Sequence, residues 1–293
     1  MPRTPAGLVL AEQQPPSPRR RRLLRLFAAG LVVVVAMAGY LGVRALIDSF
    51  NPSACWTTGS TASGPVEVTP EQAGNAATIT AVAVRRGLPT RAATIALATA
   101  FQESKLRNLR YGDRDSVGLF QQRPSQGWGT VEQILDPVYA ANAFYDKLVK
   151  VKDYLTRPLT AVAQDVQRSG APLAYAQHED EAAALAAALT GAAPATLVCR
   201  LDPPDTPPTT ERVAAALATD LGEEATVAGR TLTVQAESAL AWAIASWAVA
   251  RAESLGIGSV EVADRRWSRA GPEAWTTAPA RAGVVVITLA GPA

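Results

Sequence analysis

The pattern of apolar and polar residues divides the chain into segments of different character. An uncharged apolar run covers residues 26–43 and follows the basic block Arg19–Arg22. Such a run can cross a hydrocarbon core about 30 Å thick, and the positive-inside rule places its N-terminal side in the cytoplasm. We therefore predict a retained transmembrane helix over 23–47, preceded by a disordered cytoplasmic tail over 1–22. The alternative is a cleaved signal peptide, for which the apolar run is long.

Two polar segments interrupt the rest of the chain and predict its domain boundaries. Residues 48–70 are rich in Ser, Thr, Gly and Pro, which is typical of a flexible linker. Residues 201–209 carry several prolines and predict a stiffer linker. These two linkers delimit a first domain at 71–200 and a second domain at 210–293.

Capping signals and helical spacing predict that the first domain is mainly helical. Pro70 after Thr69 starts a helix that runs to Arg86, and Asp136 precedes the start of another at Pro137. The nearly continuous apolar run 92–101 predicts a helix that is buried on most sides. Further helices are predicted over 130–135, 158–167 and 173–189.

The second domain shows a mixed pattern. Helices are predicted over 210–221 and 236–255, a hairpin over 225–234, and strands over 258–262 and 283–289. This order predicts a small α/β accessory domain, so the fold class of the whole chain is α+β. Trp267 and Trp275 have two interpretations, as exposed binding residues or as a cover for the sheet.

Composition narrows the chemistry. A net charge of +2 gives no reason to expect a nucleic-acid partner. The two cysteines, Cys55 and Cys199, both follow the apolar run, so we expect them to pair outside the membrane. With a single histidine, His178, the chain has no basis for a Cys-rich zinc site and little for a His-based triad. We expect no metal and no cofactor.

Glu103 is the candidate catalytic residue, because an apolar helix ends there in a polar, glycine-rich segment. Apolar surroundings and the negative end of the helix dipole both raise the pKa of a carboxyl group. The nearby Lys105 and Arg107 oppose both effects. A raised pKa is what a general acid needs near neutral pH.

The segment after Glu103 combines turn-forming glycines with aromatic and amide side chains. Tyr111, Gln126 and Trp128 are candidates to stack on a sugar ring or to hydrogen-bond to it. The alternative is a small β element near residues 110–122 with a phenylalanine and a tryptophan in its core.

Two motifs in this region match a known family. Glu103-Ser104, followed by a Ser116-x-Gly-Leu-Phe-Gln segment that ends at Gln121, resembles the signature of the lysozyme-like lytic transglycosylases of bacterial cell walls. Phe120 stands where that signature usually has Met. The run 122–129, Gln-Arg-Pro-Ser-Gln-Gly-Trp-Gly, is similar to a version found in actinobacterial wall proteins. The resemblance covers about 71–181.

The resemblance implies that Glu103 is the essential carboxylate. In that family the glutamate protonates the glycosidic oxygen between N-acetylmuramic acid and N-acetylglucosamine, and then acts as base on the muramoyl 6-hydroxyl, which closes a 1,6-anhydro ring. The expected partners are therefore peptidoglycan glycan strands and the cytoplasmic membrane. The residues expected to contact substrate are Ser104, Tyr111, Ser116, Gly118, Leu119, Phe120, Gln121, Gln126, Trp128 and Tyr175.

Two features leave the activity open. A hydrolase usually needs a second carboxylate, which Asp113 or Asp115 could supply, although both also fit a solvated turn. The family carries an Ala-Tyr-Asn-x-Gly segment whose tyrosine lies near the glutamate. Its nearest counterpart here, 163–170, has no tyrosine; Gln167 or Arg168 occupies that place. We therefore hold two hypotheses, a membrane-anchored extracellular peptidoglycan-cleaving enzyme and a catalytically inactive wall-binding or scaffolding protein.

Overall fold

The computed structural model divides into two units, Met1–Pro52 and Ser53–Ala293, and describes residues 27, 29–43, 52–59, 64–168 and 173–291. In the first unit residues 29–43 are helical and exposed. No helix within the described residues is both long and apolar enough to span a membrane. The predicted tail and both ends of the predicted transmembrane helix lie outside the described residues.

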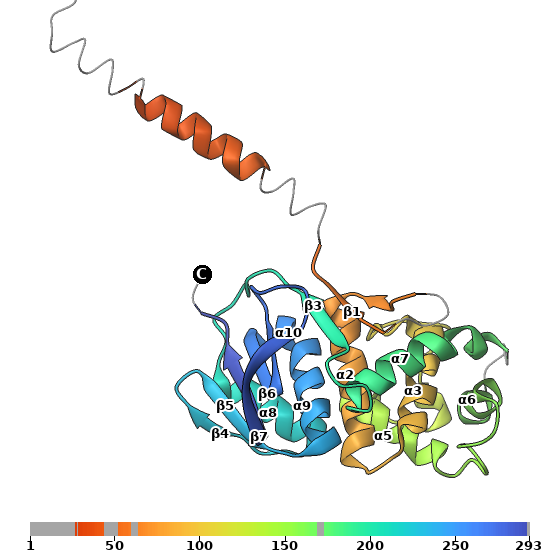
Figure 1. Cartoon of the computed structure of the whole chain (residues 1–293). Coiled ribbons are helices and arrows are strands. Elements are labelled where there is room, and N and C mark those ends of the chain that lie inside the picture. The colour runs from red at the N-terminus through yellow and green to blue at the C-terminus, as the bar shows by residue number, and fades with distance from the viewer. Residues whose placement is uncertain (1–26, 28, 44–51, 60–63, 169–172, 292–293) are drawn as a thin grey trace, which may run out of the picture. The chain divides into compact units, whose positions relative to one another are not determined.

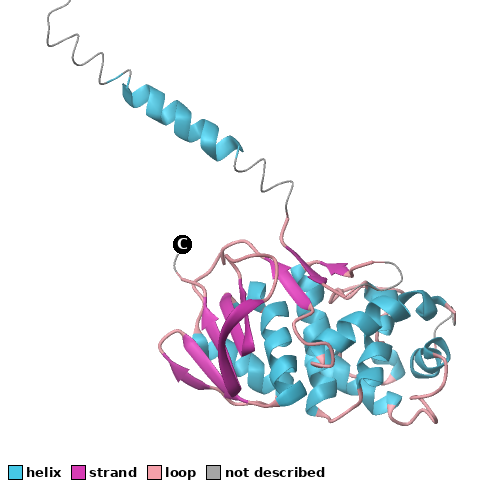
Figure 2. Cartoon of the chain, in the orientation of Figure 1, coloured by secondary structure: helices cyan, strands magenta, loops and turns pink. Residues whose placement is uncertain are grey.

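The second unit contains helices and sheets, which confirms the predicted α+β class (Figures 1 and 2). The α-helices are α2 (Pro70–Arg85), α3 (Thr90–Ser104), α4 (Val131–Ile134), α5 (Pro137–Leu148), α6 (Leu159–Gln167), α7 (Glu179–Leu189), α8 (Thr210–Leu221), α9 (Ser238–Ala250) and α10 (Ala252–Leu255). The short 3-10 helices are η1 (Pro124–Gln126) and η2 (Ala174–His178). The strands are β1 (Ala54–Thr57), β2 (Glu67–Val68), β3 (Leu197–Arg200), β4 (Thr226–Ala228), β5 (Thr231–Gln235), β6 (Ile257–Ser268) and β7 (Thr276–Leu289).

Side-chain caps fix where several helices begin. The Thr69 hydroxyl accepts the backbone N–H of Gln72, and the Gln72 side chain accepts that of Thr69, which together form a capping box at α2. Asp136 accepts the N–H groups of the first turn of α5. These bonds satisfy donors that a helix start otherwise leaves unpaired, so the predicted starts at these positions are confirmed.

A small antiparallel sheet with the order β2-β1-β3 corrects one prediction. Residues 48–70 were expected to form a flexible linker, but their described part contributes β1 and β2. In β1, Cys55 lies directly opposite Cys199 of β3, and the two form the predicted disulfide. The prediction failed because the strand partner of β1 lies more than a hundred residues away in the sequence, where local composition gives no sign of it.

The second sheet has the order β4-β5-β7-β6, with antiparallel neighbours. The indole N–H of Trp267 donates to the carbonyl of Cys199, and that of Trp275 donates to the carbonyl of Leu197. Both indoles are buried. The interpretation of these tryptophans as exposed binding residues is therefore wrong; they attach the long β6–β7 hairpin to β3.

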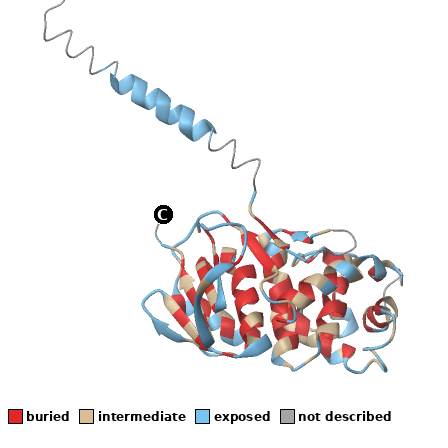
Figure 3. Cartoon of the chain, viewed as in Figure 1, coloured by how far each residue is buried: buried red, intermediate tan, exposed pale blue. Residues whose placement is uncertain are grey.

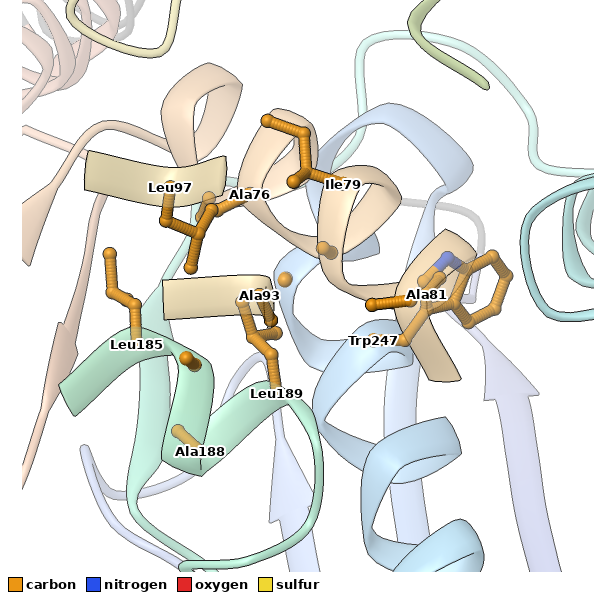
Figure 4. Packing of buried hydrophobic residues seen from close by; sticks show 14 of the residues in the cluster. Ala76, Ile79, Ala81, Ala93, Leu97, Leu185, Ala188, Leu189 and Trp247 are labelled. Atoms are coloured by element: carbon orange, nitrogen blue, oxygen red, sulfur yellow. The ribbon is translucent and has the colours of Figure 1, made fainter. Parts of the chain in front are cut away.

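The core is centred on α2 and α3, whose residues are buried on almost every side (Figure 3). Ile79 of α2, Leu97 of α3 and Leu185 of α7 are fully buried members of this core (Figure 4). On its other side α2 packs against α9, which carries Trp247 (Figure 4). The Trp247 indole and the Thr78 hydroxyl both donate to the buried Asp220 carboxylate of α8. Helices from both predicted domains thus bury one another.

Candidate active site

Glu103 lies in the last turn of α3. The helix ends there because Lys105 adopts a left-handed backbone conformation, with a φ of 53°, and Leu106 follows with a φ of 57°. The neighbouring Ser104 is buried, and its hydroxyl lies 2.7 Å from the Leu119 carbonyl oxygen. Ser104 therefore joins the helix to the next segment, and its predicted contact with substrate stays a prediction.

Two side chains hold the Glu103 carboxyl group. The Tyr175 hydroxyl donates to Glu103 Oε1 over 2.7 Å, and the Gln167 side chain makes a second hydrogen bond. Burial raises the pKa of Glu103, the two hydrogen bonds lower it, and the net pKa lies above its ordinary value. Glu103 thus keeps its proton to a higher pH than an exposed glutamate, which suits a general acid.

The tyrosine beside Glu103 does not come from the segment where it was sought. Tyr175 lies in η2, is fully buried and lies 72 positions after Glu103. The described part of the expected counterpart, 163–168, supplies Gln167 instead. The Gln167 amide also donates to the Phe120 carbonyl oxygen, which lies 2.7 Å from Nε2. One amide therefore links Glu103 to the Ser116–Gln121 segment.

The Ser116–Gln121 segment is largely a support for the site. Leu119 and Phe120 are fully buried, and Phe120 stacks on Phe144 with ring centroids 4.7 Å apart. The expected β element consists of isolated bridges, one of them between Leu109 and Gly118. The side chains of Leu119 and Phe120 therefore pack inside the protein and support the loop, and their predicted contact with substrate stays a prediction.

Gly118 is required by the geometry of this segment. Its φ is +82°, and a Cβ built on it would lie 2.8 Å from the Ile134 carbonyl oxygen. Its N–H also donates to the Leu109 carbonyl over 2.6 Å. The motif predicts that Gly118 contacts substrate. In the structure its backbone N–H is hydrogen-bonded within the protein, and its lack of a side chain allows the close approach to Ile134.

Glu103 opens into a groove that consists of two hollows. The first has a volume of about 490 Å³ and is lined by Glu103, Asp113, Arg114, Ser116, Gln121, Arg123, Gln126, Trp128, Gln167 and Arg168. The second has a volume of about 590 Å³ and is lined by Gln126, Trp128, Lys147, Lys150, Val151, Asp165, Val166, Gln167 and Arg168. Four residues line both hollows, so the two lie next to each other.

The groove brings together part of the predicted substrate-binding set. Ser116, Gln121, Gln126 and Trp128 line the hollow that contains Glu103. Tyr111 does not line either hollow, and its side chain is 73% exposed. Tyr175 lies behind Glu103 and contacts its carboxyl group directly.

The two candidate second carboxylates differ in their surroundings. Asp115 accepts the Nε–H of Arg123 over 2.7 Å and the backbone N–H of Ser125 over 2.8 Å. These bonds hold the pKa of Asp115 far below its ordinary value, so this carboxylate is a poor proton acceptor. Asp113 lines the first hollow and is almost fully exposed, and its carboxylate lies 3.9 Å from Arg114 Nε.

Sequence reasoning missed most of the cations of the groove. Arg114 and Arg123 come from the loops after α3, whereas Lys147 and Lys150 come from the end of α5 and the turn after it; of the four, Arg123 belongs to a motif, the 122–129 run. Only the folded chain brings them together, so no local signal could have identified them. Within the described residues, no cluster of three His, Cys, Asp or Glu side chains could hold a metal ion. Comparison with protein-family models and with curated proteins found no match to this chain.

Proposed function

We propose that the protein cleaves peptidoglycan at the bond between N-acetylmuramic acid and N-acetylglucosamine, as a lytic transglycosylase or a lysozyme-type muramidase. The observation that carries the proposal is the Glu103 carboxyl group, which opens into a groove, has a raised pKa and accepts a hydrogen bond from Tyr175. A reaction with one catalytic carboxyl group requires that this group is protonated near neutral pH, and a raised pKa favours the protonated form.

The proposed reaction uses Glu103 twice. The protonated carboxyl group gives its proton to the glycosidic oxygen as the bond from that oxygen to the anomeric carbon breaks. The resulting carboxylate then takes the proton of the muramoyl 6-hydroxyl, whose oxygen forms the new bond to the anomeric carbon. The ring closes as a 1,6-anhydro sugar, and Glu103 is protonated again.

Tyr175 and Gln167 support the second half of this reaction. Both donate to the carboxyl group, and a hydrogen bond to the ionised form stabilises it. Burial favours the acid that starts the reaction, and the two donors favour the base that completes it. Their opposition keeps the pKa of Glu103 within reach of both states.

The proposed location is outside the cytoplasmic membrane, with residues 23–47 as the anchor. The Cys55–Cys199 disulfide fits an oxidising compartment. A reporter enzyme that is active only outside the cytoplasm, fused after Ala293, should be active. Activity of a cytoplasm-specific reporter at the same position would reverse the proposed orientation.

The experiment that tests the chemistry compares the full chain with its Glu103→Gln variant on purified peptidoglycan. Glu71→Gln, at an exposed position in the first turn of α2, is the matched control. We expect 1,6-anhydromuramoyl ends in the mass spectrum from the unchanged chain and from Glu71→Gln, and none from Glu103→Gln.

The other outcomes are equally informative. Reducing ends would identify a hydrolase and would make Asp113 the candidate partner carboxylate. Equal release by Glu103→Gln would exclude Glu103 as the catalytic acid. Binding to the wall without release by any form would support the alternative, a catalytically inactive wall-binding or scaffolding protein.

A further inference from the structure

The end of the groove away from Glu103 concentrates positive charge. Lys147 lies in the last turn of α5, and Lys150 lies in the turn that follows. Arg168 ends α6 with a left-handed backbone, with a φ of 54°. All three line the second hollow. Within the described residues none of them makes an ion pair.

The charges in this hollow repel one another. Burial lowers the pKa of Lys147, and the positive charges of Arg168 and Lys150 lower it further. Asp165 is the carboxylate that lines this hollow, but Arg157 binds it over 2.8 Å. The cluster therefore costs stability in the free protein, and an anion in the hollow would relieve that cost.

Trp128 holds one of the cations in place. The Lys147 ammonium lies 3.1 Å from the centroid of the Trp128 ring, and the indole is buried. The ring face under the ammonium is thus occupied and does not serve as a platform for a sugar. Its role is to attract and position the charge that faces the hollow.

The cationic hollow adjoins the hollow that contains Glu103. Gln126, Trp128, Gln167 and Arg168 line both. Gln167 also hydrogen-bonds to Glu103, so the residue that contacts the acid forms part of the wall of the second hollow. A ligand whose sugar lies at Glu103 can therefore extend a substituent toward the three cations.

We infer that the second hollow is a subsite for the carboxylate groups of the peptide stem carried by the muramoyl residue at Glu103. This inference rests on the proposed function. The sugar hydroxyls of a glycan strand are neutral, whereas the stem attached through the lactyl ether carries carboxylates. Ammonium and guanidinium groups bind carboxylates through charge-assisted hydrogen bonds, and about 590 Å³ provides room for several peptide residues.

The experiment compares cleavage by the full chain, kept in a mild detergent, of two sets of glycan strands. Both carry the same stem peptides, but in one set the stem carboxylates are converted to amides, which removes the charge and keeps the size. We expect kcat/KM to be about tenfold higher for the carboxylate strands. In Lys147→Gln/Lys150→Gln this ratio should fall most of the way toward one, because only Arg168 remains, and the single Lys150→Gln variant should give an intermediate ratio.

Lys152→Gln is the matched control, because Lys152 is exposed two positions further on and does not line the hollow. It should keep the ratio of the unchanged chain. Lys150 is itself exposed, so its substitution tests the subsite without disturbing the packing of Trp128. A ratio near one in the unchanged chain, with both strands cleaved, would overturn the inference and leave the proposed function standing.

Cleavage of neither strand would instead overturn the proposed function, and direct titration with a soluble muramoyl peptide then decides the subsite. Binding that is weakened in Lys150→Gln and retained in Lys152→Gln would support a carboxylate subsite in a binding protein. The absence of binding would overturn the inference as well.

Discussion

At the scale of single residues, the site balances opposing influences on one carboxyl group. Lys105 and Arg107 were expected to oppose the rise in the pKa of Glu103, but both side chains are exposed. The groups that lower the pKa are Tyr175 and Gln167, and burial outweighs them. The direction follows from the apolar helix. The family resemblance had already singled out Tyr175 and Gln167, but their hydrogen bonds to Glu103 cross 72 and 64 positions of sequence, which no local pattern predicts.

Tyr175→Phe should raise the pKa of Glu103 further, because it removes a hydrogen bond that stabilises the carboxylate. The alkaline limb of the pH–rate profile should move to higher pH, and kcat should fall by about tenfold or more. The measurement is kcat against pH on peptidoglycan fragments. Tyr145→Phe, which removes a buried hydrogen bond to the Ile79 carbonyl, should lower stability without moving that limb. An unmoved limb in Tyr175→Phe would contradict this account.

Glu103→Gln should make the protein more stable at neutral pH. The folded pKa of Glu103 lies above its ordinary value of 4.5, so its contribution to stability is full below that value and is lost as pH rises through the folded pKa. Gln never ionises and avoids this loss. Thermal unfolding should therefore show a Tm difference between variant and unchanged chain that is near zero at about pH 4 and positive at about pH 7. A difference that does not depend on pH would refute the argument.

At the scale of elements, local signals predicted helices well and distant pairings poorly. Capping by Thr69 and Asp136 acts within four residues, so the starts of α2 and α5 could be derived from sequence. Strand β1 pairs with β3 across a separation of 144 positions at Cys55, and its composition resembles a linker. The cations of the groove could not be predicted for the same reason, because Lys147, Lys150 and Arg168 come together only when α5 and α6 pack.

Gly118→Ala should unfold or distort the loop below Glu103. The substitution combines an unfavourable left-handed backbone with a contact of 2.8 Å to a carbonyl oxygen, and should cost about 2–4 kcal/mol. Gly127→Ala is the matched control, because its φ of +75° is similar but nothing lies within 4 Å of the new Cβ. It should cost only about 1 kcal/mol. Urea unfolding of both variants measures the difference, and equal costs would show that the close contact is unimportant.

At the scale of the whole molecule, the parts on either side of the proline-rich segment depend on each other. In the second unit, α2 packs against α3 and α5 and also against α9 (Figure 4). The buried Asp220 receives donors from Thr78 of α2 and Trp247 of α9. The change in composition at 201–209 predicted a linker between two domains, but the sequence held no sign that helices on both sides would pack together.

A chain that ends at residue 209 should therefore not fold as a catalytic domain. The loss of residues 210–293 would expose the apolar side of α2. It would also expose the backbone carbonyls of β3 that accept hydrogen bonds from Trp267 and Trp275. We expect little near-UV circular dichroism, no cooperative unfolding transition and no cleavage of peptidoglycan. A cooperative transition close to that of the full chain would show that residues 210–293 are an independent accessory domain.

The disulfide has a mechanical consequence for a chain that is tethered at one end. A pull applied between the N-terminus and the C-terminus passes from Cys55 directly to Cys199 through the covalent bond between them. The residues between these cysteines, including Glu103 and Tyr175, form a closed loop that carries none of the tension. If the chain is anchored in a membrane as proposed, such a pull would strain the segments outside the Cys55–Cys199 loop before it stretched the groove that contains Glu103.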